Sequence, residues 1–524
     1  MDKMNKVSML NREYKAKEGG KAYKNNLKEK LVELFTLGLL NGTFYTKQED
    51  LIENASELFI EALEKEPYFA TKCAIYGSNT ANLKLIPTIW MVYLSTMGNK
   101  ELFYKAFPKV IRNFNMLYDF LEISRKSNIR EGLGRATKKA VNDRFITLIN
   151  DYHATRSKNT LKEIAKTTRP LNKDEHFQKL MKYVIKDELT FDRAIALKTV
   201  ISALKNGCYS EEINELVIKY KIQLEEVKHS VSTLSNEDKR RLYGTMYKSL
   251  SYSALILNLV ALERVFATET KEEYEYSPSQ SRFIKAKKVI SSDIPEDILD
   301  MVCDRISDVK AYNKSKMLPF ALINAENKVV TKEFKEAIDR LLNKVIASTF
   351  DIDTDKGILI GVDTSGSMAS EIVPGMTAVK IASLFGAMLS VSKAETKLCA
   401  VASFCKEVEI EEKSNVFNIS KAIIKTDVNH GTYFEELLKE YTNEDYVILI
   451  TDNEPADSLE RKWLNKKKDG AKLIIWQIQT SGHVISKDPS VIYVRGYSDR
   501  ILSLIKSIIE HKDNQEEEID KIEL

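Results

Sequence analysis

The stretch DIDTDKGILIGVDTSGSM, residues 351–368, marks the point where the pattern of the chain changes. Before it, apolar residues recur every three or four positions, which is typical of amphipathic helices. Within it, the run from Gly357 to Asp363 is apolar and bounded by polar residues, which indicates a buried strand. The stretch therefore predicts that a second domain, of a different fold class, begins here.

The region after this strand alternates short apolar runs with helical patterns. Continuous apolar strands separated by helices indicate a parallel, doubly wound sheet that is covered on both faces. We expect this α/β domain to span residues 356–511, and a charged, frayed tail to follow at residues 512–524. The further predicted strands are 397–404, 446–451, 472–479 and 491–494, and the predicted helices are 379–391, 435–441, 458–468 and 498–511.

The region before residue 350 is helical throughout, with an N-terminal segment at residues 1–27. Apolar residues such as Leu51, Ala55 and Leu58 follow the helical spacing, and polar clusters interrupt the pattern roughly every 15 to 20 residues. Consecutive antiparallel helix pairs over this length favour an α-solenoid, although no strict sequence period is present. We therefore assign an all-α, helical-repeat domain to residues 28–350.

Oxygen-bearing side chains follow the predicted strands of the α/β domain. Asp363, Ser365 and Ser367 lie at the carboxyl end of the first strand, Asp452 follows another, and Thr432 lies in a loop between them. In an open α/β sheet, ligands bind outside the carboxyl ends of the strands. Hard oxygens suit Mg²⁺, which usually keeps several waters. The alternative is an ordinary turn, because Asp, Ser, Thr and Gly all favour turns and helix caps.

The helical domain carries two groups of basic residues at helical spacing. If residues 132–145 form a helix, Arg135, Lys138 and Lys139 share one face, while Ala136 and Ala140 share another. A second group begins at Lys158, and its members follow at spacings of four, four and three residues, so they also lie on one face of a helix. Phosphate contacts from such faces give affinity without reading the sequence of a nucleic acid. The alternative is a solvated surface, since 30% of all residues are charged. The candidate RNA-binding residues are Arg130, the first basic stripe (Arg135, Lys138, Lys139) and the second basic stripe (Lys158, Lys162, Lys166, Arg169).

Composition excludes several classes of protein. The chain has 524 residues, of which 43% are hydrophobic, so it is neither disordered nor a membrane protein. Its longest apolar run, 254–262, is about nine residues and is too short to cross a bilayer. The first residues contain no apolar segment typical of an export signal, so we expect a cytoplasmic protein. The five cysteines are dispersed, which favours neither a disulfide framework nor a zinc site.

Charge is distributed unevenly between the two predicted domains. Residues 351–524 contain 21 Lys and Arg against 30 Asp and Glu, a net charge of −9, which leaves +12 for residues 1–350. This asymmetry suggests that the helical part faces a polyanion. The sequence contains no GxxxxGK[ST], GxGxxG or HExxH segment, so NTPase, dinucleotide-binding and zinc-protease functions have no support.

The motifs of the α/β domain resemble those of a known metal site. DTSGSM at residues 363–368, HGT at 430–432 and TDNE at 451–454 are similar, in order, to the metal ion-dependent adhesion site (MIDAS) of a von Willebrand factor type A domain. The resemblance implies direct coordination by three hydroxyls and water-mediated contacts from two carboxylates. Relatives often read GGTD where this chain has HGTY, so a carboxylate is missing while the ligand hydroxyl is kept. The implied set is Ser365, Ser367 and Thr432 as direct ligands, with Asp363 and Asp452 acting through waters.

The helical part resembles the TROVE domain of the Ro ribonucleoprotein family, which comprises the Ro autoantigen and its bacterial and phage relatives. The similar segments, in order, are LFTLGLLNGTFYT (34–46), GLGRATKKAVNDRF (132–145), SYSALILNL (251–259) and MLPFALINA (317–325). The resemblance implies a ring of HEAT-like helix pairs closed by the type A domain. It also implies binding of small, Y-like RNAs on the outside and of single-stranded RNA ends through the central hole. One cationic contact is missing, because relatives commonly carry Arg where this chain has Leu257.

These observations lead us to expect a monomeric, non-enzymatic ribonucleoprotein scaffold that acts in RNA quality control or processing. It would use Mg²⁺ as its cation, contact no membrane, and recruit a protein such as an exoribonuclease through the metal site. The alternative is a metal-dependent protein–protein adhesion module in which the helical array is a spacer. Metal-dependent phosphoryl chemistry at Asp363 and Asp452 ranks last, because a single Mg²⁺ without a nearby base or second metal is poorly equipped for it. We expect no catalytic residue.

Overall fold

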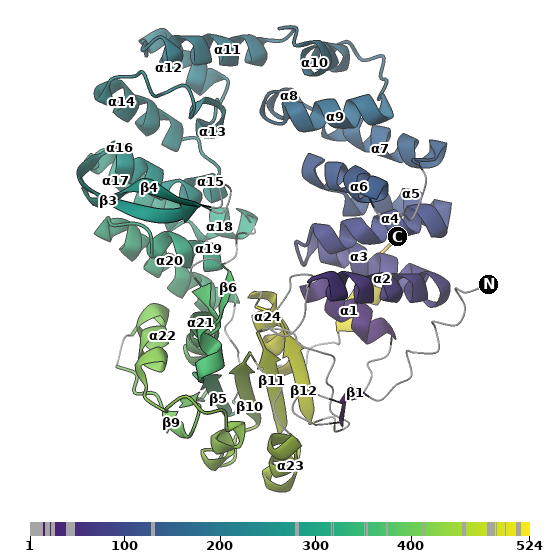
Figure 1. Ribbon diagram of the computed structural model, residues 1–524, viewed down its shortest axis with the longest axis vertical. Helices are drawn as coiled ribbons and strands as arrows, with labels where there is room; N and C mark the ends of the chain where they lie inside the picture. Colours follow the sequence, from purple (N-terminus) through teal and green to yellow (C-terminus); the bar gives the residue numbers. More distant parts are fainter. Residues whose placement is uncertain are drawn as a thin grey trace. The chain divides into compact units, whose positions relative to one another are not determined.

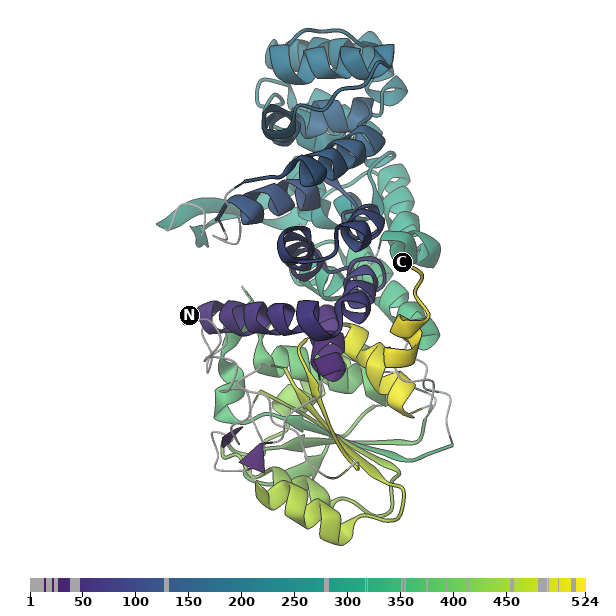
Figure 2. The same cartoon turned by 90° about the vertical axis from the view of Figure 1, so that its right-hand side faces the viewer.

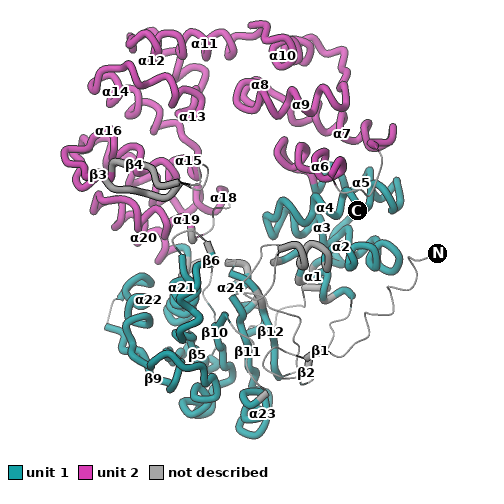
Figure 3. The backbone as a smooth tube through the Cα atoms, in the orientation of Figure 1, with its two compact units in different colours: residues 1–110, 345–524 teal, residues 111–344 magenta. Residues whose placement is uncertain are grey.

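Contacts between residues divide the protein into two compact units, which Figure 3 shows in different colours. Unit 1 comprises residues 1–110 and 345–524, and unit 2 comprises residues 111–344. The secondary structure changes from helical to α/β near residue 350, and the first 110 residues group with the α/β part. The computed structural model describes residues 14–15, 21–22, 27–37, 48–126, 132–277, 282–315, 317, 319–349, 352, 355–373, 376–392, 394–411, 414–452, 457–478, 488, 490–497, 499–509 and 515–524.

The N-terminal helices of unit 1 pack around a cluster of aromatic rings. The ring of Phe59 lies 5.6 Å from that of Trp90 and 5.5 Å from that of Tyr93, and Phe35 joins the same cluster. Helix α3 begins at Pro67, which suits the first turn of a helix because its missing N–H would have no partner there. The elements are β1 (Tyr14–Lys15), β2 (Lys21–Ala22), α1 (Leu27–Leu37), α2 (Gln48–Lys65), α3 (Pro67–Asn79), α4 (Leu85–Met97) and α5 (Lys100–Val110).

Unit 2 is an array of short helices in which most helices pack against close neighbours in the chain (Figure 1). The polar clusters that interrupt the apolar pattern become helix caps. The side chains of Asn150, Asp174, Ser210, Ser235 and Ser251 each accept a backbone N–H three residues later. The helices are α6 (Phe114–Lys126), α7 (Arg135–Leu148), α8 (Asp151–Arg156), α9 (Lys158–Thr168), α10 (Glu175–Lys186), α11 (Asp192–Lys205), α12 (Glu211–Lys219), α13 (Leu224–Val227), α14 (Asn236–Tyr247), α15 (Tyr252–Leu257), α16 (Leu259–Val265), α17 (Glu296–Ile306), α18 (Val309–Ser315), α19 (Pro319–Glu326) and α20 (Lys332–Thr349).

A β-hairpin interrupts this array, so the prediction of continuous helix was wrong here. Strands β3 (Ala267–Ser277) and β4 (Arg282–Ser292) pair in antiparallel fashion (Figure 2). Thr270 pairs with Val289, and both residues are β-branched, a type that favours strands. The many charged residues of both strands are also common in exposed helices, and they conceal the strand pattern.

The α/β part of unit 1 is built on a six-stranded sheet with the order β12-β11-β10-β5-β8-β9. Counted from β5, this is the doubly wound order 3-2-1-4-5-6, in which the chain reverses direction across the sheet between β5 and β10. Strands β12, β11, β10, β5 and β8 are parallel to one another. Strand β9, at the edge beside β8, is antiparallel. The strands are β5 (Ile358–Asp363), β8 (Thr396–Val401), β9 (Cys405–Glu407), β10 (Tyr446–Thr451), β11 (Lys472–Gln477) and β12 (Val491–Arg495).

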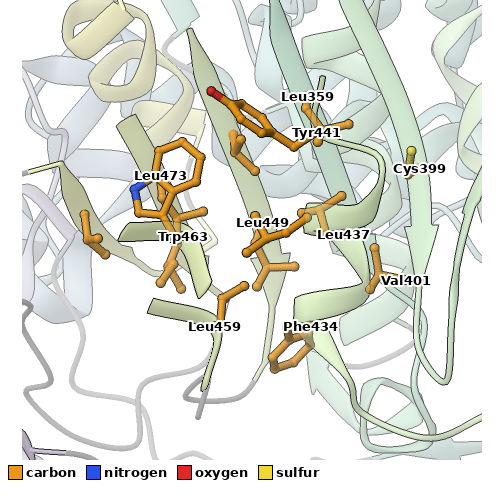
Figure 4. Packing of buried hydrophobic residues seen from close by; sticks show 14 of the residues in the cluster. Leu359, Cys399, Val401, Phe434, Leu437, Tyr441, Leu449, Leu459, Trp463 and Leu473 are labelled. Atoms are coloured by element: carbon orange, nitrogen blue, oxygen red, sulfur yellow. The ribbon is translucent and has the colours of Figure 1, made fainter. Parts of the chain in front are cut away.

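Both faces of the sheet are covered. On one face, Leu359, Leu449 and their neighbours pack against Leu437 and Trp463 (Figure 4). On the other face, the Phe385 ring lies 4.3 Å from that of Trp476. The remaining elements of this part are η2 (Gly366–Ala369), β6 (Glu371–Val373), β7 (Met376–Thr377), α21 (Ala378–Ser390), α22 (Val416–Lys425), η3 (Phe434–Lys439), α23 (Asp457–Lys466), α24 (Asp499–Ile509) and α25 (Gln515–Asp520).

The fold class predicted from the sequence is confirmed: a helical-repeat array is followed by a doubly wound α/β domain. The five predicted strands correspond to β5, β8, β10, β11 and β12, while β9 and α22 were not predicted. The expectation of a frayed tail was wrong, because Gln515–Asp520 is a helix that packs on α1 and α3 and buries Ile519 completely. Among the helices that the structure describes, none is long and apolar enough to cross a membrane.

The close packing of α21 on β5 makes Gly386 sensitive to substitution. A Cβ atom at Gly386 would lie 2.5 Å from Cγ2 of Val362, a distance that the packed layers cannot accept without shifting. We predict that Gly386→Ala lowers the unfolding free energy by about 1–3 kcal/mol, even though Ala favours helices more than Gly does. Gly357→Ala is the control, because its Cβ would approach no atom closer than 3.6 Å. Equal thermal stability of the two variants would contradict the prediction.

Candidate metal centre and basic surfaces

The predicted metal residues lie at the position where the sheet order reverses. Strands β5 and β10 are parallel neighbours, with Leu449 paired to Gly361 and Ile450 to Val362. Their carboxyl ends therefore meet at one edge, where Asp363 ends β5 and Asp452 follows β10. This edge is where open α/β sheets bind their ligands. The structure thus brings together two carboxylates that are far apart in the sequence.

Asp363 is completely buried and organises the loop that follows β5. Its Oδ1 accepts the backbone N–H of Ser365 at 2.8 Å, and its Oδ2 accepts the hydroxyl of Thr451 at 2.6 Å. The first bond curls the loop back toward the strand, and the second joins β5 to the end of β10. Thr451 was not singled out from the sequence, although its place immediately before Asp452 in TDNE was a usable signal.

The two serines of the loop connect Asp363 to Asp452. The Oγ atoms of Ser365 and Ser367 lie 3.2 Å apart, and the Ser367 hydroxyl donates to Oδ1 of Asp452 at 3.1 Å. Ser365 and Asp452 are almost fully buried, with 3% and 2% of their surfaces exposed. Four of the five predicted metal residues therefore form one connected cluster of oxygen atoms.

Thr432, the fifth predicted residue, lies in the adjacent loop. The backbone N–H of Gly366 donates to the carbonyl of His430 at 3.3 Å, so this loop touches the one that carries the serines. Gly431 donates its N–H to the Ser403 hydroxyl at 2.9 Å, and a Cβ there would lie 2.7 Å from the same oxygen. The Thr432 side chain is exposed and makes no hydrogen bond to the residues that the structure describes. The Thr432 loop therefore contacts the serine loop, but no hydrogen bond among the described residues joins the Thr432 hydroxyl to the cluster.

The burial of two carboxylates changes their ionisation. Burial raises the pKa of Asp363 above its usual range, although hydrogen bonds from Ser365 and Thr451 oppose this shift. Burial and the neighbouring Asp363 carboxylate raise the pKa of Asp452 to about 7. The hydrogen bond from the Ser367 hydroxyl lowers this pKa, but by less. Buried charges of like sign repel each other and need a counter-ion. The cluster therefore has the electrostatic character of a cation site.

Hard oxygen atoms from carboxylates and hydroxyls make up the donor set. No group of three or more His, Cys, Asp or Glu side chains suited to a metal is found within the described ranges, so a cage of charged ligands is not present there. Two carboxylates and two connected hydroxyls instead fit Mg²⁺, which prefers oxygen ligands and retains water molecules. When bound, such a cation would supply positive charge to the two carboxylates and an open coordination position.

The first basic stripe lies on the exposed face of α7. Arg135 and Lys138 are exposed and have no side-chain partner among the described residues, whereas Lys139 pairs with Asp143 at 2.7 Å. Arg130 lies outside the described residues. The buried face of α7 differs in part from the predicted one, because Ala136 is only half-buried and the buried residues are Thr137, Ala140, Val141 and Phe145.

The second basic stripe is largely neutralised by acidic neighbours. Lys158 and Lys162 both pair with Asp187, and the Lys158 ammonium also lies 3.9 Å from the centre of the Tyr183 ring. Lys166 pairs with Glu163 at 3.1 Å. Arg169 ends α9 in the left-handed conformation and is exposed. The structure therefore favours the solvated-surface interpretation more for this stripe than for the first.

A hollow of about 550 Å³ in unit 2 was not predicted from the sequence. Arg193 lies beside it and donates two hydrogen bonds to Glu226, at 2.9 and 2.7 Å. Glu226 neutralises this guanidinium, while the lining also contains the ionisable side chains of Asp151 and Lys221. Its lining residues are Asn150, Asp151, Tyr152, Arg193, Tyr220, Lys221, Gln223, Ser249 and Ser251.

The raised pKa of Asp452 predicts how stability depends on pH when no divalent cation is present. Between about pH 5 and 7 the folded protein holds a proton on Asp452, while the unfolded chain, with an ordinary pKa of 3.8, has lost it. The unfolding free energy should therefore fall as pH rises, by up to about 1.4 kcal/mol per pH unit. Calorimetry in a chelator measures this slope. Asp452→Asn, which carries no charge, should flatten the slope, and an unchanged slope would contradict the prediction.

Comparison with solved structures finds a likeness that covers nearly the whole chain. The crystal structure of the Ro (RSR) protein of Deinococcus radiodurans matches with a TM-score of 0.66 and 14% sequence identity, over 93% of this chain and 100% of that chain. An aerotolerance-related membrane protein of Bacteroides fragilis covers 30% of this chain and 99% of its own length, with 12% identity and a TM-score of 0.22. No protein-family model and no curated protein matches the sequence. The first likeness includes both the helical array and the α/β domain, so the chain has the fold of a Ro protein.

Proposed function

We propose that this protein is an RNA-binding scaffold of the Ro type. Its helical part would hold small, structured, Y-like RNA and the single-stranded ends of misfolded RNA, in RNA quality control or processing. The shared fold with a Ro protein supports this proposal, as does the net charge of +12 on residues 1–350. The observation that carries it is the exposed face of α7, where Arg135 and Lys138 project without acidic partners among the described residues.

Exposed, unpaired cations are suited to phosphate oxygens. Each phosphate contact releases a condensed counterion, so binding weakens as salt concentration rises. A lysine that is already paired with a carboxylate contributes less free energy to RNA binding, because its contact with a phosphate must replace its contact with the carboxylate. We therefore expect the first basic stripe to contribute more to RNA affinity than the second, even though the sequence pattern of the two is similar.

We predict that Arg135→Ala together with Lys138→Ala weakens RNA binding across sequences. The slope of log affinity against log salt should fall in magnitude by about 1.4 to 1.8, the value for two phosphate contacts. Fluorescence anisotropy with a labelled stem-loop RNA and with a labelled oligouridine measures both quantities. The matched control replaces Lys158 and Lys162, which share Asp187, by Ala and should change the slope less. An unchanged slope in the first variant would show that its residues are only solvated.

The metal centre would have a separate task. We propose that the cluster binds Mg²⁺, with Ser365, Ser367 and Thr432 as direct ligands and with Asp363 and Asp452 acting through waters. The buried carboxylate pair supports cation binding because its two charges have no cationic partner in the cluster. A cation with an open position suits a carboxylate from another protein, such as an exoribonuclease, rather than catalysis. The protein would thus act as a scaffold and not as an enzyme.

We predict that Ser367→Ala weakens Mg²⁺ binding by roughly 10- to 100-fold, as removing groups around a metal commonly does. The variant loses a proposed ligand and the hydrogen bond to Asp452. Thr364→Val is the matched control, because the neighbouring Thr364 hydroxyl is buried without a hydrogen bond to any described residue. Isothermal calorimetry should find the control equal to the natural chain. If Ser367→Ala binds Mg²⁺ with the natural affinity, the proposed site is wrong.

The competing function is a metal-dependent adhesion module with a helical spacer. Neutralisation of the second basic stripe favours it, since Lys158, Lys162 and Lys166 each have an acidic neighbour. The exposed aromatic side chains of Phe404 and Tyr433, beside the metal loops, would suit a protein partner. RNA binding by the natural chain, measured as above, separates the two functions, because a spacer has no reason to bind RNA.

A further inference from the structure

Residues 515–524 form an acidic segment that lies on the N-terminal helices of unit 1. The segment, QEEEIDKIEL, contains five acidic residues and one lysine. Its helix α25 contacts α1 and α3, and its side chain Ile519 is completely buried. Full burial of an isoleucine is worth about 1.5–3 kcal/mol, so this residue is the apolar anchor of the segment.

Three lysines from three helices meet the segment around this anchor. The Lys28 ammonium of α1 lies 3.8 Å from Oδ2 of Asp520. Lys72 of α3 donates to the backbone carbonyl of Asp520, and Lys109 of α5 donates to that of Glu523 at 2.9 Å. Helix α3 packs against both α1 and α5, so the three lysines belong to one continuous surface. We call Lys28, Lys72 and Lys109 the lysine surface.

The polar contacts of the segment are of a kind that other anions can replace. The hydrogen bonds of Lys72 and Lys109 lie on the exposed surface, and the Lys28 side chain keeps 32% of its area accessible. Exposed ion pairs contribute about 0–1 kcal/mol each and weaken with salt. The last carbonyls of a helix lack intrahelical partners, which leaves the carbonyl of Asp520, the last residue of α25, free to accept from Lys72, while Glu523 lies beyond the helix. Phosphate oxygens offer the same three ammonium groups a higher density of negative charge.

We propose that residues 515–524 are an internal competitor of RNA phosphates for the lysine surface. This inference rests on the proposed RNA-binding function and assigns a regulatory role to a segment outside the two basic stripes. Because Ile519 keeps the segment in place, its carboxylates and carbonyls are present at high effective concentration. RNA must displace the polar contacts before its backbone reaches Lys28, Lys72 and Lys109. The segment therefore lowers the affinity of the protein for RNA and makes that affinity less dependent on salt.

The experiment compares the natural chain with a variant that lacks residues 515–524. Binding of fluorescein-labelled oligouridine is measured by anisotropy between about 50 and 200 mM salt. The deletion should tighten binding by roughly fivefold or more at the lowest salt, and it should steepen the salt slope by about 2, the value for three contacts with a single strand. In the deletion background, replacing Lys28, Lys72 and Lys109 by Ala should abolish the gain. Equal affinity and slope with and without the segment would overturn the proposal.

A second variant covers the case in which the deletion loses its fold, as judged by circular dichroism. Asp520→Asn with Glu523→Gln keeps Ile519 in place but removes two charges of the segment. This variant should bind the oligouridine more tightly than the natural chain, and an unchanged affinity would overturn the proposal. If no form of the protein binds the probe, the proposed RNA function fails together with this inference. If binding depends on Arg135 and Lys138 but not on the segment, only this inference fails.

Discussion

The α/β domain depends on the burial of two carboxylates, Asp363 and Asp452, at the edge where the sheet order reverses. Each would be costly alone in an apolar interior. Backbone and hydroxyl donors from Ser365, Thr451 and Ser367 offset part of this cost, and in doing so they shape the loops. The remaining repulsion between the carboxylates leaves a place for positive charge. Under the proposed function, a bound cation would supply that charge.

Sheet topology explains why these residues meet. Because β5 lies between β8 and β10, the chain leaves β5 on one side and returns to its other side after α22. The loops after β5 and β10 therefore begin at the same edge, the position at which open α/β sheets bind their ligands. Gly431 allows a third loop to approach Ser403 closely beside them. The geometry of the centre follows from strand order, and the identity of the side chains only decides which ligand it suits.

The sequence allowed the strands to be predicted, and it allowed five oxygen-bearing side chains to be placed at strand ends and loops, four of which lie together, because both signals are local. A buried strand is a short apolar run, and Asp363, Ser365 and Ser367 follow one directly. Contacts between distant segments leave no such local signal. The pairing of Lys158 with Asp187 depends on how α9 packs against α10, so the second basic stripe seemed as available as the first. Likewise, Ile519 in a charged tail gave no indication that it would be buried against α1 and α3.

Formal charge is therefore a poor guide to where this protein can bind a polyanion, and pairing is a better one. The helical part is strongly basic, yet several of its lysines already have carboxylate or carbonyl partners within the chain. Arg135 and Lys138 differ, because the first turn of α7 places them in solvent and brings no acidic residue of the described chain beside them. An RNA that binds this protein gains most where the chain has not already satisfied its own cations. If the protein binds RNA as proposed, its affinity depends on a small number of unpaired residues, and the paired lysines contribute only where RNA displaces their internal partner.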